Sequence, residues 1–341
     1  MLLIAAMLVT VGVHAATDIR RGAIERGPFL GRAPVQEFID TIVQRHSFDR
    51  AALVALFAGA QRQNRVLELV SKPAEGKPWR EYRQIFLTPE RAREGVKFWQ
   101  ANEDMLERAQ ETYGVAPEVI VAIIGVETYY GRQTGGFDVF DTLATLGFDY
   151  PPRGRFFLSE LEQFLLLTRE EAIDPASTEG SYAGAMGKGQ FISSSYRAYA
   201  VDFDEDGKRD LWSSNADAIG SVANYFKRHG WREGAPVVMP AKIEGNHYKK
   251  LLDAGLKPKF SQNDLRIHGV KMEEKLHPQT RLTLVALDGA KGREYWVGLN
   301  NFYVITRYNH SPRYAMAVHQ LGERLKKLKR RADEADARRG R

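Results

Sequence analysis

The sequence predicts a mainly α protein that carries a small β-containing insert. Apolar residues recur at helical spacing through the first half of the chain. Prolines open and glycines close several of these segments, as helix ends favour. After Trp231 the pattern changes to short alternating runs, which indicate strands. The 341 residues suffice for one large domain or two to three smaller ones, each with a buried core.

The chain begins with MLLIAAMLVTVGVHAATD, which is typical of a secretory signal peptide. The apolar run Leu2–Val13 is too short to span a bilayer comfortably, and cleavage is expected near Ala15 or Ala16. No lysine or arginine precedes the run, so an uncleaved anchor or a start further upstream are the alternatives. From the signal peptide we expect a periplasmic protein. Because the sequence contains no cysteine, we expect neither disulfides nor a lipid-modified cysteine.

The first half predicts a series of helices. Pro34 opens an amphipathic segment, and Thr88-Pro89 is an N-cap followed by a first-turn proline. Apolar residues then continue at helical spacing to Gly114, which predicts one helix over this stretch. Further helices are expected over Pro117–Gly131 and Phe156–Glu171.

The second half predicts the β-containing insert. Val237–Ile243 reads as a short strand, and Arg281–Leu287 and Glu294–Val297 flank the turn Asp288–Gly292 as a hairpin. Ser311-Pro312 then opens a final helix. The expected division is a signal peptide (1–16), an N-terminal helical region (17–95), a catalytic core with the acidic loop (96–231), a small β-containing domain (232–298), a return to the core with the C-terminal helix (299–325) and a basic tail (326–341).

The net charge of +6 comes largely from the C-terminus. Nine lysines and arginines against four acidic residues between Glu323 and Arg341 contribute +5 of it. The rest of the chain is near neutral, so nucleic acid is not an expected partner. A solvated, partly frayed tail is the favoured interpretation. Attraction to an anionic polymer such as peptidoglycan, or to the inner-membrane surface, is the alternative.

One carboxylate occupies an apolar position in PEVIVAIIGVETYYG. Ile120, Ile123 and Ile124 define a buried stripe, and Glu127 is the next position of the series. Burial there disfavours the charged carboxylate, and the nearby negative end of the helix dipole acts in the same direction. A carboxyl that stays protonated near neutral pH can act as a general acid on a glycosidic bond. A solvated glutamate, or one paired with Arg132, is the alternative.

Two further segments have compositions that suit carbohydrate. GSYAGAMGKGQF (180–191) offers close backbone approach together with Ser181 and Gln190, although four glycines could equally serve a close helix crossing. YWVGLNNFYVITRYNHSPRYAMAV (295–318) interleaves aromatic residues with Asn309, and part of it is expected in the core.

The segment DFDEDGKRD (202–210) resembles the start of an EF-hand calcium loop. Carboxylates fall at positions 1, 3, 5 and 9, glycine at position 6, and Lys208 would offer its carbonyl at position 7. Position 12 is Ser213 rather than glutamate, so Asp217 is the candidate for the last ligand. These features predict a structural Ca²⁺ site of modest affinity. Separately, we expect no cofactor for catalysis.

Five segments together resemble the lytic murein transglycosylase B family. They are IIGVETYYGRQTG, LATLGFDYPPRGRFF, GSYAGAMGKGQF, DAIGSVANYFKRHGW and FYVITRYNHSPRYAMAV, and they occur in the family's order within a match from about Pro34 to Leu325. The resemblance implies a lysozyme-like α+β core with an added helical domain and a small β domain. It also implies an enzyme that cleaves the bond between N-acetylmuramic acid and N-acetylglucosamine in peptidoglycan without water, leaving 1,6-anhydro ends.

The same resemblance assigns individual residues. It implies that Glu127 is the single catalytic acid/base. The implied glycan-binding residues are Tyr82, Ser181, Gln190, Tyr225, Tyr308, Asn309 and Tyr314. The implied calcium ligands are Asp202, Asp204, Asp206, the carbonyl of Lys208, and Asp217, although this loop has one residue more than expected between Gly207 and Asp217. A monomer that acts on glycan strands, alone or with cell-wall synthesis or hydrolase partners, is expected. A hydrolytic muramidase and a non-catalytic peptidoglycan-binding scaffold are the rival functions.

Overall fold

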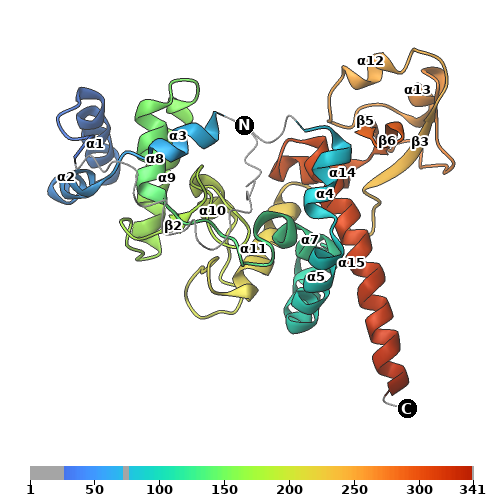
Figure 1. Cartoon of the computed structure of the whole chain (residues 1–341), viewed down its shortest axis with the longest axis horizontal. Helices are drawn as coiled ribbons and strands as arrows, with labels where there is room; N and C mark the ends of the chain where they lie inside the picture. Colours follow the sequence, from blue (N-terminus) through green and yellow to red (C-terminus); the bar gives the residue numbers. More distant parts are fainter. Residues whose placement is uncertain (1–26, 72–76, 340–341) are drawn as a thin grey trace. The chain divides into compact units, whose positions relative to one another are not determined.

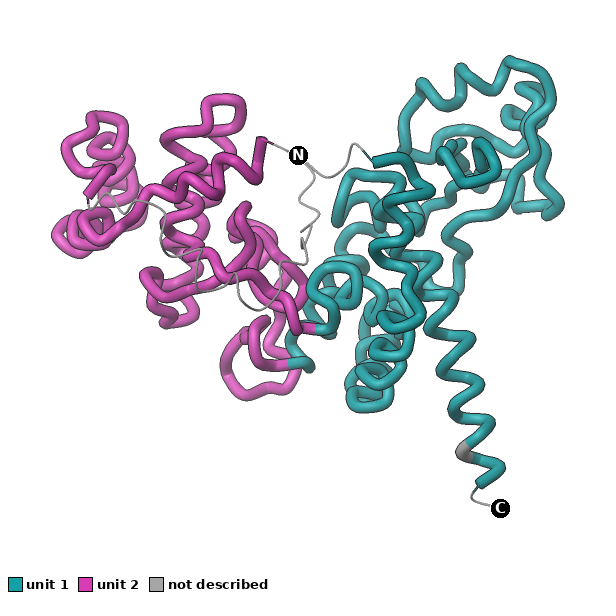
Figure 2. The backbone as a smooth tube through the Cα atoms, viewed as in Figure 1, with its two compact units in different colours: residues 1–5, 74–130, 215–341 teal, residues 6–73, 131–214 magenta. Residues whose placement is uncertain are grey.

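The structure is a computed structural model that describes residues 27–71 and 77–339. The expected signal peptide lies outside the described residues. The described chain forms two compact units, each made of two separate stretches of sequence (Figure 2). Unit 1 contains residues 77–130 and 215–339, and unit 2 contains residues 27–71 and 131–214. The boundaries of these units differ from the boundaries of the six segments expected from the sequence. The six-segment division remains a prediction.

Unit 2 is helical apart from one short two-stranded ribbon (Figure 1). Phe57 and Phe140 meet edge to face in its core, with ring centroids 5.0 Å apart. The strands β1 and β2 pair antiparallel with Phe137 opposite Gly180. Its elements are α1 (Ala33–His46), α2 (Arg50–Gly59), α3 (Asn64–Val70), β1 (Phe137–Asp138), α8 (Val139–Asp149), α9 (Gly154–Glu170), β2 (Glu179–Gly180) and α10 (Ser193–Tyr199).

Unit 1 contains the longest helix, α15, which packs against α4, α5, α7 and α14. Its elements are α4 (Trp79–Phe86), α5 (Pro89–Ala101), α6 (Glu103–Tyr113), α7 (Pro117–Thr128), α11 (Asn215–Arg228), β3 (Val238–Ile243), α12 (Lys249–Leu252), α13 (Gln262–Ile267), β4 (Val270–Lys271), β5 (Thr283–Gly289), β6 (Gly292–Gly298), α14 (Asn300–Tyr308) and α15 (Pro312–Arg339). The four antiparallel strands lie in the order β4-β3-β6-β5 over a small core of their own (Figure 1).

The mainly α class is confirmed, and so are the predicted strand β3 and the hairpin β5–β6. The single helix expected from Pro89 to Gly114 is wrong: it is two helices, α5 and α6, that divide at Asn102. The Asn102 side chain donates to the Phe98 carbonyl at 2.7 Å, which satisfies one of the carbonyls at the end of α5. Gly114 ends α6 in the left-handed conformation, as predicted.

The basic tail is also more regular than expected. Rather than fraying, α15 continues through it to Arg339. Salt bridges one turn apart, Lys329–Asp333 and Arg330–Glu334, accompany the helical conformation. Within residues 27–71 and 77–339, no helix is long and apolar enough to span a membrane.

Candidate active site

Glu127 lies in the last turn of α7, in the interior of unit 1. Eleven of the twelve residues of α7 are buried, so the helix is covered on every face rather than along the single isoleucine stripe expected from the sequence. The predicted burial of Glu127 itself is confirmed, because its side chain is 3% exposed. A helix ends here because Tyr129 adopts a left-handed conformation, two residues before the glycine expected to end it.

Burial dominates the electrostatics of Glu127. Loss of solvent raises the pKa of its carboxyl to about 8, against an opposing contribution from a hydrogen bond with Tyr314. The Tyr314 hydroxyl donates to Oε1 of Glu127 at 2.5 Å. A carboxyl of this kind is mostly protonated at neutral pH, and its ionised form would still have one hydrogen-bond donor already in place.

Four tyrosines from four helices accompany Glu127 in unit 1. Tyr314 comes from α15, Tyr308 from the end of α14, Tyr225 from α11 and Tyr82 from α4. Burial, and then the proximity of Glu127, raise the pKa of Tyr308 and of Tyr314 well above the ordinary value for a phenol. The rings of Tyr225 and Tyr308 meet edge to face at 4.8 Å, and the Tyr225 hydroxyl donates to the Arg307 carbonyl. Phenols that stay neutral can donate hydrogen bonds without adding charge beside the glutamate.

Asn309 follows α14 directly and is buried. Its Oδ1 accepts from the backbone N–H of Ser311 at 3.1 Å. Its Nδ2 is buried without a hydrogen-bond partner, which is costly unless something else accepts from it. An amide group in this state is suited to a carbonyl or hydroxyl of a bound sugar.

Ser181 and Gln190 belong to unit 2. The segment between them consists of turns and contains no helix, so its glycines do not mediate a close helix crossing. Ser181 Oγ accepts from the Ala185 backbone N–H at 3.0 Å. Gln190 has a left-handed backbone, and its Nε2 donates to the carbonyls of Thr134 and Gly187, both at 3.0 Å. Its buried Oε1 has no hydrogen-bond partner, so the group that Gln190 offers is an acceptor.

The acidic loop 202–210, also in unit 2, has the local geometry of a calcium loop. Asp202 accepts from the backbone N–H groups of Asp206 and Gly207, at 3.1 and 2.8 Å. Gly207 has a φ of 90°, which allows the sharp turn that position 6 requires. Carboxylate oxygens of Asp202 and Asp204 lie within 4.8 Å of each other, whereas Oδ1 of Asp206 accepts from the Lys208 backbone N–H at 2.9 Å. The donor set consists of hard oxygen ligands and fits Ca²⁺.

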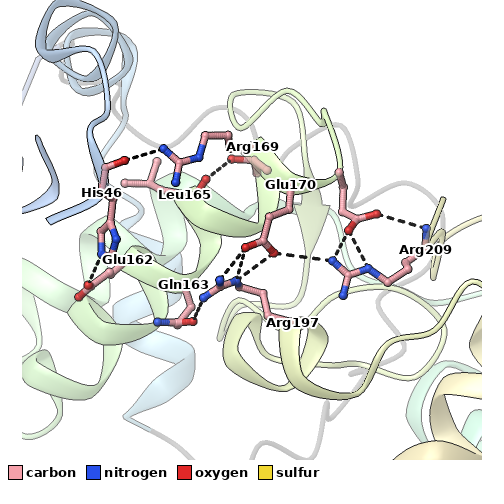
Figure 3. Close-up of polar contacts among 10 residues, drawn as sticks. His46, Glu162, Gln163, Leu165, Arg169, Glu170, Arg197 and Arg209 are labelled. Atoms are coloured by element: carbon pink, nitrogen blue, oxygen red, sulfur yellow. Dashed lines mark hydrogen bonds and ion pairs between the residues drawn. The ribbon is translucent and has the colours of Figure 1, made fainter. Parts of the chain in front are cut away.

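Ion pairs fix both flanks of this loop to the end of α9 (Figure 3). Arg209 pairs with Glu171 and lies 3.7 Å from Glu170, while Arg197 of α10 pairs with Glu170 at 2.6 Å. Asp210, at position 9 of the loop, instead accepts from the backbone N–H groups of Trp212 and Ser213. Asp217 lies in unit 1, buried in the first turn of α11.

Asp138 and Asp141, the carboxylates that follow Glu127 most closely in sequence, have structural tasks in unit 2. Asp138 caps α8 by accepting from the Asp141 backbone N–H at 2.8 Å. Burial raises the pKa of Asp138 to about 7. Asp141 accepts from the backbone N–H of Gln61 and the side chain of Gln63.

Comparison with known proteins gives consistent matches along the chain. A family model described as a transglycosylase SLT domain matches residues 31–323. The membrane-bound lytic murein transglycosylase B of Escherichia coli (strain K12) is 47% identical over 307 residues, which cover 87% of this chain and 84% of that protein. The catenated lytic transglycosylase SltB1 from Pseudomonas aeruginosa superposes with a TM-score of 0.84 at 49% identity, covering 88% of this chain and 99% of that one. The Escherichia coli lytic transglycosylase Slt35 in complex with calcium gives a TM-score of 0.81 at 45% identity, covering 90% and 96%.

Proposed function

The chain belongs to the transglycosylase SLT domain family, and from that premise we propose that Glu127 is the single catalytic acid/base of a peptidoglycan lytic transglycosylase. The activity class follows from the family and from relatives that match most of the chain. The assignment of Glu127 rests on one observation: a carboxyl buried in unit 1 whose pKa is about 8 and whose Oε1 accepts from Tyr314.

In the first step, protonated Glu127 gives its proton to the oxygen that bridges N-acetylmuramic acid and N-acetylglucosamine. The bond from that oxygen to C1 of the muramic acid breaks, and N-acetylglucosamine leaves with a hydroxyl group. Positive charge develops at C1, and the substrate's own acetamido group assists it. The Tyr314 hydroxyl supports the Glu127 carboxylate that forms, through the hydrogen bond that is already present.

In the second step, the Glu127 carboxylate accepts the proton of the muramyl C6 hydroxyl. The C6 oxygen closes onto C1 and gives the 1,6-anhydro end, and Glu127 returns to its protonated form. Ordinary glycosidases need a second carboxylate to attack carbon or activate water. Internal attack removes this need, which agrees with the structural roles of Asp138, which caps α8, and of Asp141, which accepts from the backbone N–H of Gln61.

The glycan-binding residues follow from the same proposal. Among the tyrosines expected by resemblance, the half-buried Tyr308 offers aromatic surface, and the buried Tyr82 and Tyr225 lie beneath the surface of unit 1. The Nδ2 of Asn309 supplies a donor without a protein partner. From unit 2, Ser181 offers its hydroxyl hydrogen and Gln190 its Oε1. These groups match the hydroxyl and N-acetyl groups of the substrate, and no charge is needed to bind them.

We propose in addition that the acidic loop holds a structural calcium ion. Asp202, Asp204, Asp206 and the carbonyl of Lys208 would ligate it, and Asp217 is the further ligand expected by resemblance. The calcium complex of the Slt35 relative supports this assignment. The ion would stabilise the loop and take no part in the proton transfers. We also propose export to the periplasm, where the substrate lies.

Digestion of purified peptidoglycan sacculi tests the function. Mass spectrometry should find muropeptides that lack one water, as 1,6-anhydro ends do, and Glu127→Gln should release none above background. Glu118→Gln, at the opposite end of the same helix and paired with Lys326, controls for the loss of a carboxylate from α7. Reducing muramic acid ends would identify a hydrolytic muramidase instead. Full release by Glu127→Gln would refute the role of Glu127.

A further inference from the structure

The backbone that follows Glu127 is strained. Tyr129 and Tyr130 have φ angles of 51° and 62°, so two successive residues with bulky side chains are left-handed. Each left-handed residue of this kind costs about 1–2 kcal/mol. Such a conformation persists only where the surrounding structure enforces it, and it is frequent beside active sites. The contacts of these two tyrosines therefore identify what holds the last turn of α7.

Tyr130 is held in a slot that two glycines form. A Cβ atom added to Gly95 of α5 would lie 2.3 Å from the Tyr130 hydroxyl, and one added to Gly125 of α7 would lie 2.6 Å from its ring. The ring also stacks on Phe98 at 5.7 Å. The hydroxyl donates to the backbone carbonyl of Arg91 at 2.9 Å. Tyr130 is therefore packed tightly between α5 and α7.

Arg91 contacts the last turn of α7 at two points, the Tyr129 ring and the Gly125 carbonyl. Its guanidinium lies 4.7 Å from the centre of the Tyr129 ring and donates through Nη1 to the Gly125 carbonyl. The backbone N–H groups of Tyr129 and Tyr130 both donate to Ile124, so the N–H that an α-helix would direct to the Gly125 carbonyl goes elsewhere. Arg91 supplies the missing donor. Its positive charge also lies at the end of α7 where the helix dipole is negative.

We propose that Arg91 is a positioning residue for the reaction: by holding the Gly125 carbonyl and the Tyr129 ring, it keeps the last turn of α7 where Glu127 meets Tyr314. The inference rests on the proposed role of Glu127. Only Val126 separates Gly125 from Glu127, so any unwinding of this turn moves the carboxyl. Misplacement by about 1 Å can reduce a rate by about 100-fold.

Steady-state kinetics of the full chain on soluble uncrosslinked glycan strands test the inference. We expect Arg91→Met to lower kcat by about 100-fold while KM changes less than about threefold. Arg91→Lys should retain the fold and recover only part of kcat, because one ammonium group cannot both cover a ring and replace the planar guanidinium at the carbonyl. Arg93→Met, on the exposed face of the same helix, removes the same charge and should leave kcat unchanged.

Wild-type kcat in folded Arg91→Met, or a loss that appears in KM alone, would overturn the inference. A fall in kcat that only follows the unfolded fraction, measured by circular dichroism, would do the same. If Arg91→Met does not fold, Arg91→Lys decides: reduced kcat with unchanged KM supports the role, and wild-type kcat refutes it. Glu127→Gln in the same assay separates the two proposals, because activity in that variant refutes the role of Glu127, whatever the Arg91 variants do.

Discussion

Replacing Glu127 with glutamine should change how the stability of the protein depends on pH. The carboxyl has a pKa of about 8 in the folded protein against an ordinary value of 4.5, a difference of about 3.5 pH units. Below pH 4.5 both states hold the proton, so Glu127 adds no pH dependence. Between the two values the unfolded chain releases the proton and the folded protein keeps it, so the free energy of unfolding falls as pH rises. Glutamine has no such proton.

The size of this effect follows from the two pKa values. Each pH unit corresponds to about 1.36 kcal/mol, so the full interval corresponds to about 5 kcal/mol. Urea denaturation at pH 5, 6, 7 and 8 should therefore give a Glu127→Gln variant that gains about 4 kcal/mol over the wild type across this range. Glu107→Gln, at an exposed position on α6, controls for the general loss of a carboxylate. A stability difference that stays constant within about 1 kcal/mol from pH 5 to 8 would refute the claim that folded Glu127 keeps its proton.

Three further perturbations follow from the described contacts. Tyr314→Phe removes the hydrogen bond that lowers the Glu127 pKa. Because a hydrogen bond to a charged group contributes about 1.5–3 kcal/mol, the pH at which activity falls on the alkaline side should rise by about 1–2 pH units. An alkaline limb at the wild-type pH would contradict this. Gly95→Ala places a Cβ against the Tyr130 hydroxyl and should lower the free energy of unfolding by about 1–3 kcal/mol, whereas Gly59→Ala, with open space around it, should not. Calcium at 100 times its dissociation constant should stabilise the protein by about 2.7 kcal/mol in thermal melts, and Asp204→Asn should reduce this gain; a melt unchanged by chelation would remove the calcium proposal.

Local chemistry made several fold elements predictable. The Thr88 side chain accepts from the Arg91 backbone N–H as an N-cap should, and Gly114 is left-handed at the end of α6. The hairpin β5–β6 could be predicted because alternation of apolar and polar residues and a glycine-containing turn are local features of the sequence. Each of these features depends on neighbours in the sequence.

Other elements depend on tertiary contacts and could not be predicted in this way. Asn102 divides two helices because its side chain bonds to a carbonyl, yet asparagine is also tolerated within helices. No propensity rule makes Tyr129 and Tyr130 left-handed, because their conformation comes from Arg91 and the slot beside Gly95. The chemistry of a single segment cannot reveal such contacts.

The residues of the candidate site also differ in whether the local sequence could predict them. Glu127 could be identified from its own helix, since an acidic residue among isoleucines and valines indicates a buried carboxyl. Its partner Tyr314 was assigned only through the resemblance, because nothing in the sequence near either residue relates one to the other. Arg91 was missed altogether, since an arginine early in a helix usually lies in solvent.

The hydrogen bond between Tyr314 and Glu127 joins residues that are 187 positions apart. A ribosome that has completed the first 300 residues has incorporated Glu127 but not Tyr314, and unit 1 still lacks α15. An interrupted translation product therefore carries an incomplete site. A chain whose synthesis stops before α15 therefore lacks the Tyr314 hydroxyl that donates to the buried Glu127 carboxyl.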